Sequence, residues 1–260
     1  MFESQPIDSL PIWSVYLLVM IFLFLAAEVG FRLGGFVQKR WPDQAEAGVG
    51  TVVGAALALL GFLLAFITGI ALENFNHRRH LVVLEADVIG TTYLRAGYLL
   101  SPYNDESRIL LREYVDIRLE ALKPGNLVDA IARSEQTHVE LWRLAEEIVK
   151  LDPSPTTALY VASLNEMIDL HSQRLHAELG FRVPQALILG LFLVGILTMV
   201  LIGVHDGYRE KHNILALIMV ILIVSVVFLL IIELDRSNVG AIRVPQEALI
   251  ELQQQLKFAP

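Results

Sequence analysis

The sequence predicts an all-α polytopic membrane protein with four transmembrane helices and a helical extramembrane domain. Three observations lead to this fold class. Of the 260 residues, 55% are hydrophobic, and they are concentrated in blocks instead of being spread along the chain. Four of these blocks reach the roughly 20 apolar residues that cross the hydrocarbon core of a bilayer. The long polar segment between the second and third blocks has helical periodicity throughout.

The first apolar block covers about 13–31 and follows an N-terminal tail of residues 1–12. This tail contains acidic residues but no Lys or Arg, and no small-residue cleavage pattern follows the block. We therefore expect the block to remain in the membrane and not to act as a cleaved signal peptide. The second block covers about 49–72, so the first pair of membrane helices occupies 13–72.

The predicted extramembrane domain comprises residues 73–183. It contains three amphipathic helical runs, of which the first follows Ser101-Pro102 and an expected N-cap at Asn104-Asp105. Breaks at Lys123–Asn126 and at Asp152–Pro155 separate the runs. Together with the ends of the membrane helices, we expect about four extramembrane helices.

The second pair of membrane helices occupies 184–234, with spans at about 184–204 and 214–232. Residues 235–260 are predicted to form a C-terminal tail. Four spans place both tails and the extramembrane domain on one side of the membrane, and the loops 32–48 and 205–213 on the other.

The orientation does not follow from basic residues near the span ends. The domain side carries six and the loop side five: Arg78, Arg79, Arg174, Arg182, Arg236 and Arg243 against Arg32, Lys39, Arg40, Arg209 and Lys211. The first span alone, with acidic residues before it and basic residues after it, favours a cytoplasmic location of the loops.

Composition argues against several other functions. The chain has no cysteine, which excludes disulfides and thiolate metal sites. Its net charge of −8 offers no basic patch for nucleic acid. We find no nucleophile elbow, no phosphate-binding glycine loop and no clustered acid–base pair, so we expect neither an enzyme nor a cofactor.

The second span carries one continuous stripe of small residues at steps of three or four. Such a stripe lets helix backbones approach closely in lipid. It consists of Gly50, Gly54, Ala58, Gly61, Ala65 and Gly69. We interpret it as a helix-packing surface.

A neighbouring stripe changes from apolar to charged along the same helix. Leu59, Phe62 and Phe66 are expected to form an apolar pore neck that closes by dewetting if several copies surround an axis. Beyond the bilayer, a polar vestibule would follow at Glu73, His77, His80 and Asp87. The alternative, in which the Phe side chains face lipid or a neighbouring span, fits the pattern equally well. No fourth ligand accompanies the Glu73, His77 and His80 spacing, so we predict no metal site there.

Further polar residues are predicted to act in intersubunit or structural contacts. Arg78 and Glu85 stand two turns apart on one helix face, beside Arg79. Three alternative roles are predicted for these residues: pairing between subunits, attraction of anions, or anchoring at headgroups. Arg174 and Asp169 are predicted to clasp the helical domain to the membrane helices. We expect His171 to be a surface or packing residue.

The block "LLGFLLAFITGIALENFNHRRHLVVLEADVIGTTYLRA" resembles the signature of the DUF4239 family of bestrophin-like membrane proteins. In that family an E-A-x-x-I-G-x-x-Y-x-R-A type stretch follows the span, here from Glu85 to Ala96 and including Arg95. The segments "LREYVDIRLEAL" and "LNEMIDLHSQRLHA" resemble two further family helices. "ELDRSNVGAIRVPQEAL", which contains Asp235 and Arg236, resembles the segment after the last span, with Ser237 where the family usually has Pro.

This resemblance implies a bestrophin-like oligomeric ion channel that favours anions, with the second helix lining the pore. Bestrophins are pentamers, and we expect a homo-oligomer of five or four copies in the bilayer of the inner (plasma) membrane, with small permeant ions as partners. The resemblance also implies that 73–183 is cytoplasmic. No dense acidic run follows the fourth span, so a calcium clasp is not expected. The alternative is a non-conducting membrane scaffold or sensor whose helical domain binds a partner.

Overall fold

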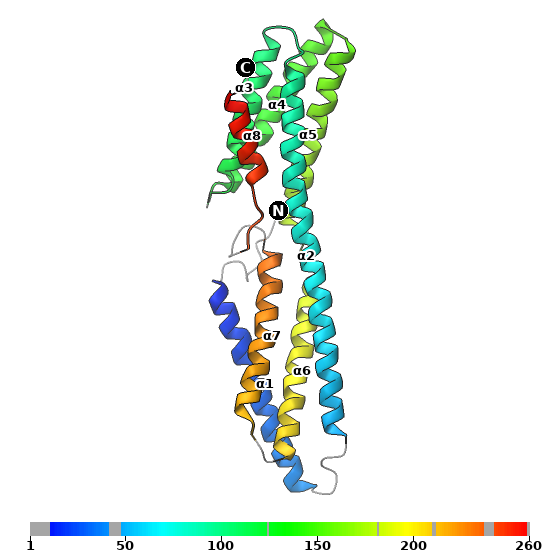
Figure 1. Ribbon diagram of the computed structural model, residues 1–260, viewed down its shortest axis with the longest axis vertical. Coiled ribbons are helices and arrows are strands. Elements are labelled where there is room, and N and C mark those ends of the chain that lie inside the picture. The colour runs from blue at the N-terminus through cyan, green and yellow to red at the C-terminus, as the bar shows by residue number, and fades with distance from the viewer. Residues whose placement is uncertain are drawn as a thin grey trace. The chain divides into compact units, whose positions relative to one another are not determined.

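The computed structural model describes residues 11–41, 48–123, 125–180, 182–209, 212–236 and 242–258. Every regular element in these ranges is an α-helix, and four of the helices are long and apolar enough to cross a membrane. The predicted fold class is therefore confirmed (Figure 1). The helices are α1 (Ile12–Arg40), α2 (Val49–Ala96), α3 (Tyr103–Glu120), α4 (Leu127–Leu151), α5 (Pro155–Leu179), α6 (Gln185–Tyr208), α7 (Ile214–Asp235) and α8 (Glu247–Phe258). The predictions for residues 1–10 and for Ser237 lie outside the described residues.

The chain divides into two compact units. The membrane unit comprises α1, the first part of α2, α6 and α7, within residues 1–75 and 182–243. The extramembrane unit comprises the rest of α2 together with α3, α4, α5 and α8, within residues 76–181 and 244–260. Helix α2 is unbroken over 48 residues, or about 72 Å, and contributes to both units.

Helix α1 extends well past the predicted end of the first span at residue 31. It continues to Arg40 and contains 29 residues, or about 43 Å, which exceeds the ~30 Å thickness of the hydrocarbon core. Arg32, Lys39 and Arg40 therefore lie on a helix, so the predicted loop 32–48 is helical as far as Arg40, and residues 42–47 lie outside the described residues. On this helix the Arg32 guanidinium donates to Glu28 one turn earlier, at 2.9 Å.

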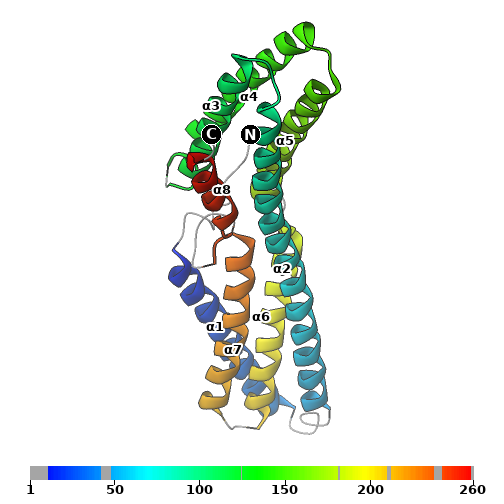
Figure 2. The ribbon, with the colours of Figure 1, turned by 45° about the horizontal axis from the view of Figure 1, so that its top comes forward.

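Glycines allow α1 and α6 to cross in close contact (Figures 1 and 2). A Cβ at Gly30 would fall on the Val200 backbone, and one at Gly203 on the Ala27 backbone. Gly34 and Gly207 make equivalent contacts one turn further along. The pairing needs residues without side chains, as is typical of helix packing in lipid.

The four membrane helices meet around Gly195 of α6. Its Cα faces Leu23 of α1, Leu60 of α2 and Phe228 of α7, each of which is buried. Helix α2 contributes one buried stripe, formed by Leu60, Leu64, Ile67 and Ala71, to this core. The remaining circumference of α2 is therefore available for other contacts.

In the extramembrane unit, the predicted breaks fall between the helices. Helix α3 ends at Glu120 and α4 begins at Leu127, with Gly125 in the left-handed region at φ 85°. Ser154 accepts a hydrogen bond from the Thr157 amide at 3.3 Å and caps α5, whose first residue is Pro155. Pro124 lies outside the described residues.

The expected N-cap at Asn104-Asp105 is wrong by two to three residues, since the N-cap is Pro102. Helix α3 begins at Tyr103, after Pro102, and has no side-chain cap. Asp105 lies instead in the first turn, where a carboxylate interacts favourably with the helix dipole.

The predicted C-terminal tail 235–260 contains a helix that belongs to the extramembrane core. Helix α8 packs Leu249, Leu252 and Leu256 against the other helices, and it lies alongside α3 in both ribbon views (Figures 1 and 2). The Arg112 side chain of α3 donates to the Leu256 carbonyl at 3.0 Å. The extramembrane domain is therefore larger than the predicted 73–183.

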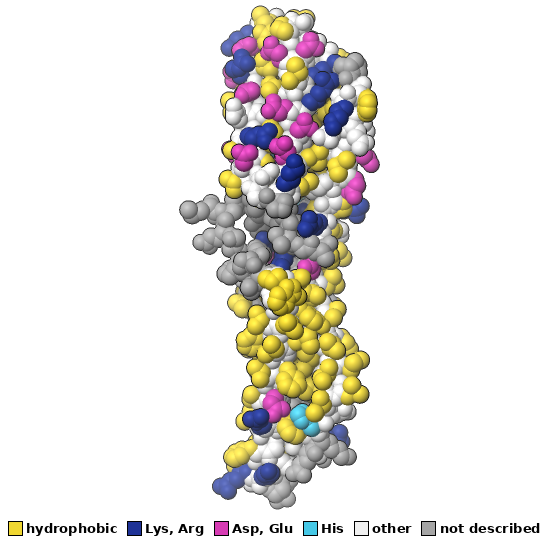
Figure 3. Space-filling view, turned by 90° about the vertical axis from the view of Figure 1, so that its left-hand side faces the viewer, with side chains coloured by type: hydrophobic (Ala, Val, Ile, Leu, Met, Phe, Trp, Pro, Cys, Tyr) yellow, Lys and Arg dark blue, Asp and Glu magenta, His cyan; other side chains and the backbone are white. Residues whose placement is uncertain are grey.

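The two units have different surfaces (Figure 3). Hydrophobic side chains dominate the visible face of the membrane unit, whereas acidic and basic side chains are interspersed on the extramembrane unit. This difference matches a lipid solvent for the first unit and water for the second.

Candidate functional site

The small-residue stripe of α2 is not used to pack helices within the chain. All six of its members are exposed: Gly50, Gly54, Ala58, Gly61, Ala65 and Gly69. A Cβ added at Gly54, Gly61 or Gly69 would have nothing within 4 Å, and one at Gly50 would meet only the His205 ring at 3.3 Å. The stripe faces away from the core made by Leu60 and Leu64.

The aromatic stripe beside it is exposed as well. Phe62 and Phe66 have exposed fractions of 65% and 55%, and Leu59 of 52%. The two Phe rings stack on each other with centroids 6.3 Å apart. Helix α2 thus presents small residues and a stacked aromatic pair on the exposed surface of the chain.

The predicted vestibule residues continue on exposed positions of α2. Glu73, His77, His80 and Asp87 are all exposed, as is Arg79. These side chains do not converge on a common centre within the chain.

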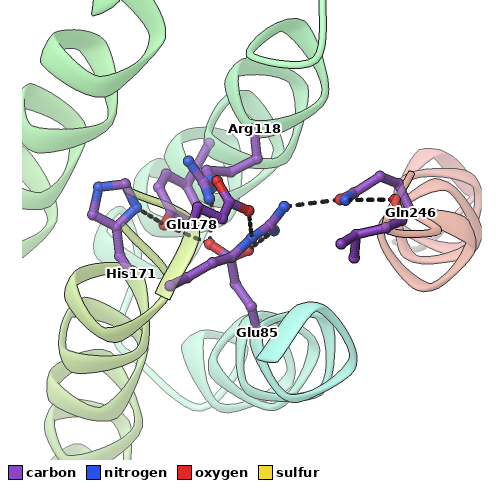
Figure 4. A network of polar contacts seen from close by, with 8 residues as sticks. Glu85, Arg118, His171, Glu178 and Gln246 are labelled. Carbon is purple, nitrogen blue, oxygen red and sulfur yellow. Dashed lines mark hydrogen bonds and ion pairs between the residues drawn. The ribbon is translucent and has the colours of Figure 1, made fainter. Parts of the chain in front are cut away.

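The structure gathers a second set of functional side chains inside the extramembrane unit, centred on Glu85 (Figure 4). Glu85 is fully buried and pairs with two buried arginines from different helices. Arg118 of α3 donates its Nε to Glu85 Oε1 at 2.9 Å, and Arg174 of α5 donates Nη1 to Glu85 Oε2. One carboxylate therefore joins α2, α3 and α5.

The Arg174 guanidinium donates hydrogen bonds to further acceptors besides Glu85. Its Nε donates to Glu178 one turn later on α5 at 2.9 Å, and its Nη2 donates to the Gln246 side chain just before α8, also at 2.9 Å. The Gln246 amide in turn donates to the Val244 carbonyl at 3.2 Å. The same guanidinium thus ties the start of α8 to the bundle.

The positive charges of Arg118 and Arg174 lie close enough to the Glu85 carboxyl group to determine its ionisation. Burial raises the pKa of Glu85, but Arg118 and Arg174 outweigh burial and lower it to about 2. For Arg174, burial lowers the pKa, but the carboxylates of Glu85 and Glu178 raise it above its usual value. The cluster is therefore held in its charged form.

A tyrosine and two histidines extend this cluster. The buried Tyr114 hydroxyl lies 3.3 Å from Glu85 Oε1 and 3.1 Å from His171 Nδ1. The His171 ring meets that of His138 of α4 edge-on, with centroids 4.8 Å apart. Burial and the Arg118 charge lower the pKa of His138 to about 4 and that of His171 to about 3. Burial raises the Tyr114 pKa well above its usual value.

Several predicted polar contacts are corrected by this arrangement. Arg174 does not pair with Asp169, which is exposed and accepts from Asn165 at 3.0 Å. Glu85 pairs with Arg118 and Arg174 within its own chain, so it is a structural residue and not an intersubunit partner of Arg78. His171 was expected at the surface or in packing, and it is buried and bonded to Tyr114, which agrees with the packing alternative.

The other predicted polar residues also make contacts within the chain. Arg78 is buried, and Arg95 donates to the Leu159 carbonyl at 2.9 Å. Asp235 accepts from the Val183 amide at 2.7 Å, so the end of α7 holds the backbone two residues before α6. Asp235 and Arg236 are both buried.

Sequence reasoning missed Tyr114, Arg118, His138 and Gln246. A signal was present for the first two, because Tyr114 and Arg118 are one turn apart and share a helix face with Leu111 and Val115, which are buried. Polar residues one turn apart on an apolar face indicate a buried polar contact. Gln246 had no such signal, since its partner lies 72 residues away.

Comparison with known proteins identifies the family. A family model described as the bestrophin-like domain matches residues 18–249. No curated protein matches the chain significantly.

Three solved structures share the fold, all described as crystal structures of alanine-substituted forms of a membrane protein. Two superpose with a TM-score of 0.64, at 14% and 15% sequence identity, covering 91% and 92% of this chain. The third has a TM-score of 0.62 at 17% identity and covers 95% of this chain. In each case the match spans 97% of the solved chain. Because the family model covers nearly the whole chain, from the first membrane helix to α8, the chain belongs to the bestrophin-like family.

Proposed function

We propose that the protein is an oligomeric ion channel, with anions favoured, in which the exposed face of α2 lines the pore. The observation that carries this proposal is that α2 leaves its small residues and its stacked Phe62–Phe66 pair outside the chain's own packing. In lipid, a stripe of small residues is useful only where another backbone approaches. A second copy of α2 is the partner we propose.

The dimensions of an α2 ring are suitable for a gated pore. Five touching helices of ~10 Å diameter leave a central hole of about 7 Å, and four leave about 4 Å. Leu59, Phe62 and Phe66 would narrow this hole to an apolar neck that excludes water. The exposed Glu73, His77, His80 and Asp87 would then surround a wider, polar mouth.

We also propose that the extramembrane unit is cytoplasmic in an inner (plasma) membrane, following the orientation of bestrophins. Basic and acidic residues are interspersed on its visible surface (Figure 3), so its surface charge does not select a nucleic-acid partner.

A halide-flux assay in liposomes tests the neck. Replacing Phe62 and Phe66 with Ala removes the apolar surface that expels water, so flux is expected to rise. Phe66→Ser is expected to act in the same direction by wetting the neck. Phe36→Ala on α1 is a matched control, because Phe36 has an exposed fraction of 66% against 65% for Phe62.

The outcomes distinguish a pore-lining position of Phe62 and Phe66 from a lipid-facing one. Higher flux in the Phe62/Phe66 variants than in wild type and the Phe36 control supports the neck. Equal flux in all of them, with the oligomer intact by light scattering, rejects it.

A second candidate function is a non-conducting scaffold or sensor. It is favoured by apolar side chains on the exposed face of α4, where Val128 and Val139 are exposed and Trp142 lies at the margin of exposure. Exposed apolar residues at helical spacing are typical of protein-binding surfaces. A stable monomer in detergent, without flux, would favour this function over the channel.

A further inference from the structure

Three buried polar atoms on α4 and α5 have no hydrogen-bond partner among the described residues. They are the Ser134 hydroxyl, His138 Nε2 and His171 Nε2, and all three residues are more than nine-tenths buried. Ser134 and His138 are one turn apart on α4, and the His138 and His171 rings touch edge to face. A buried polar atom without a partner costs about 1–3 kcal/mol, so such a group calls for an unseen partner.

The hydrogen bonds around His171 define which kind of partner it needs. Tyr114 has one proton and donates it to the Glu85 carboxylate, a charged acceptor. His171 Nδ1 must then carry a proton to bond the Tyr114 oxygen. If His171 takes up a second proton, its Nε2 becomes a donor for which the described part of the chain supplies no acceptor.

The surrounding charges disfavour a metal cation at this position. The facing groups are Glu85 of α2, Tyr114 and Arg118 of α3, and Arg174 and Glu178 of α5. Both acidic groups are already bonded to arginines. The charge of Arg118 lowers the pKa of both histidines more than Glu85 raises it, which indicates a net positive potential at the pair. A positive potential attracts an anion and repels a cation.

We propose that Ser134, His138 and His171 form a buried site for a small inorganic anion, such as chloride, that binds together with a proton. The anion accepts from the Ser134 hydroxyl and from the Nε2 atoms of the two imidazoles, with Arg118 nearby. Proton and anion enter together, because either charge alone is unfavourable in a buried cluster whose other charges are already balanced. The site is separate from the proposed pore, so each can fail independently.

Thermal unfolding of the full-length protein in detergent tests the site, with chloride replaced by gluconate at constant ionic strength. Chloride is expected to raise the unfolding temperature of wild type, and its apparent Kd is expected to fall by up to about tenfold for each unit that the pH decreases from 7.5 to 5.5. Ser134→Ala should weaken chloride binding by about tenfold or more, because it removes a hydrogen bond to a charged group.

Ser163→Ala is the matched control, since Ser163 is equally buried in the same unit but already donates to the Tyr160 carbonyl at 2.9 Å. It is expected to retain the chloride response of wild type. If Ser134→Ala does not fold, His138→Gln replaces it, with the same expected loss. A chloride response that is absent from wild type, or identical in wild type and the Ser134 and His138 variants, overturns the proposal.

Crystals grown with bromide provide a direct check. An anomalous peak between Ser134, His138 and His171 supports the site. Density without anomalous signal at this position means that water alone satisfies these atoms, and this result also overturns the proposal.

Discussion

Glu85 and Asp87 stand two positions apart on α2, yet the structure places them in opposite environments. Glu85 is fully buried between Arg118 and Arg174, whereas Asp87 is exposed. At the residue scale, burial therefore decides whether a carboxylate holds the fold together or remains available to ions. Removing one partner from a buried ion pair is costly, because the remaining charge is left without compensation.

Replacing Glu85 with Gln should destabilise the extramembrane unit strongly. The change leaves the buried Arg118 guanidinium without its negative partner and leaves Arg174 with Glu178 alone, and the expected cost is about 3–5 kcal/mol. Glu120→Gln is the control, since Glu120 pairs with Arg133 in a half-exposed contact that water screens, so its loss should change stability little. Hydrogen–deuterium exchange at α5 amides measures the opening free energy. Equal protection in both variants would contradict the structural role of Glu85.

The two buried histidines should make this unit sensitive to acid. Their pKa values in the folded chain, about 4 for His138 and about 3 for His171, lie below the ordinary 6.5, so the unfolded chain binds more protons below pH 6.5. The contribution of the two histidines to the unfolding free energy is therefore fully present above pH 6.5. It falls as the pH decreases, by up to about 1.4 kcal/mol per pH unit for each histidine. Glu85 adds to the loss only below pH 4.5, the ordinary value from which its pKa is lowered.

The measurement is the unfolding free energy of the unit in halide-free buffer between pH 7.5 and 4.5. The variant His138→Gln/His171→Gln should show a flatter pH dependence than wild type. His176→Gln, at an exposed position on the same helix as His171, should retain the wild-type slope. A slope unchanged in the double variant would refute the assignment.

At the scale of helices, the spans and the breaks between helices were predictable because apolar length and turn residues are local signals. The continuation of α1 to Arg40 was not predictable, because the hydropathy of a sequence indicates where an apolar span ends but not where the helix that carries it ends. Helix α8 was missed because it is only 12 residues long, and its three buried leucines become a core face only against α3. The cluster around Glu85 joins residues from five segments, and no local pattern specifies such a combination.

Small residues illustrate the same limit. The sequence predicted close packing for the α2 stripe, yet the intrachain close contact is made by Gly30, Gly34, Gly203 and Gly207 of α1 and α6. Spacing indicates that a helix can be approached closely, but it does not identify the neighbour. The exposed stripe on α2 therefore remains the surface for which an intersubunit role is predicted.

Enlarging glycines on the two surfaces should have different consequences. In Gly203→Leu, the new side chain meets the Ala27 backbone, so α1 and α6 separate and the protein should lose folded yield and thermal stability. In Gly61→Leu, the new side chain meets nothing within its chain, so the fold should survive while the oligomer weakens.

Size-exclusion chromatography with light scattering checks both variants. Smaller or mixed species for Gly61→Leu, at a helix content equal to wild type, is the expected result. A homogeneous oligomer of unchanged mass would argue against an intersubunit role for the α2 stripe.

At the scale of the whole molecule, the topology leaves one binary question, which is the side of the membrane that the extramembrane unit occupies. Four spans place both the unit and the start of α1 on the same side. Basic residues near the span ends are almost evenly divided, and charge bias sets orientation only where it is uneven. Arg32, Lys39 and Arg40 continue α1 as a helix on the loop side, where long basic side chains commonly reach the headgroups.

Cysteine labelling in intact cells decides the orientation, and the chain has no native cysteine to interfere. Ser172 on α5 and His212 in the loop before α7 are both exposed, and they lie on opposite sides of the membrane in the four-span topology. With the extramembrane unit in the cytoplasm, an impermeant maleimide should label His212→Cys and spare Ser172→Cys until the cells are permeabilised. Strong labelling of Ser172→Cys in unpermeabilised cells, with His212→Cys protected, would reverse the proposed orientation. The vestibule at Glu73, His77, His80 and Asp87 would then open to the outside, and a pore would receive its ions from there.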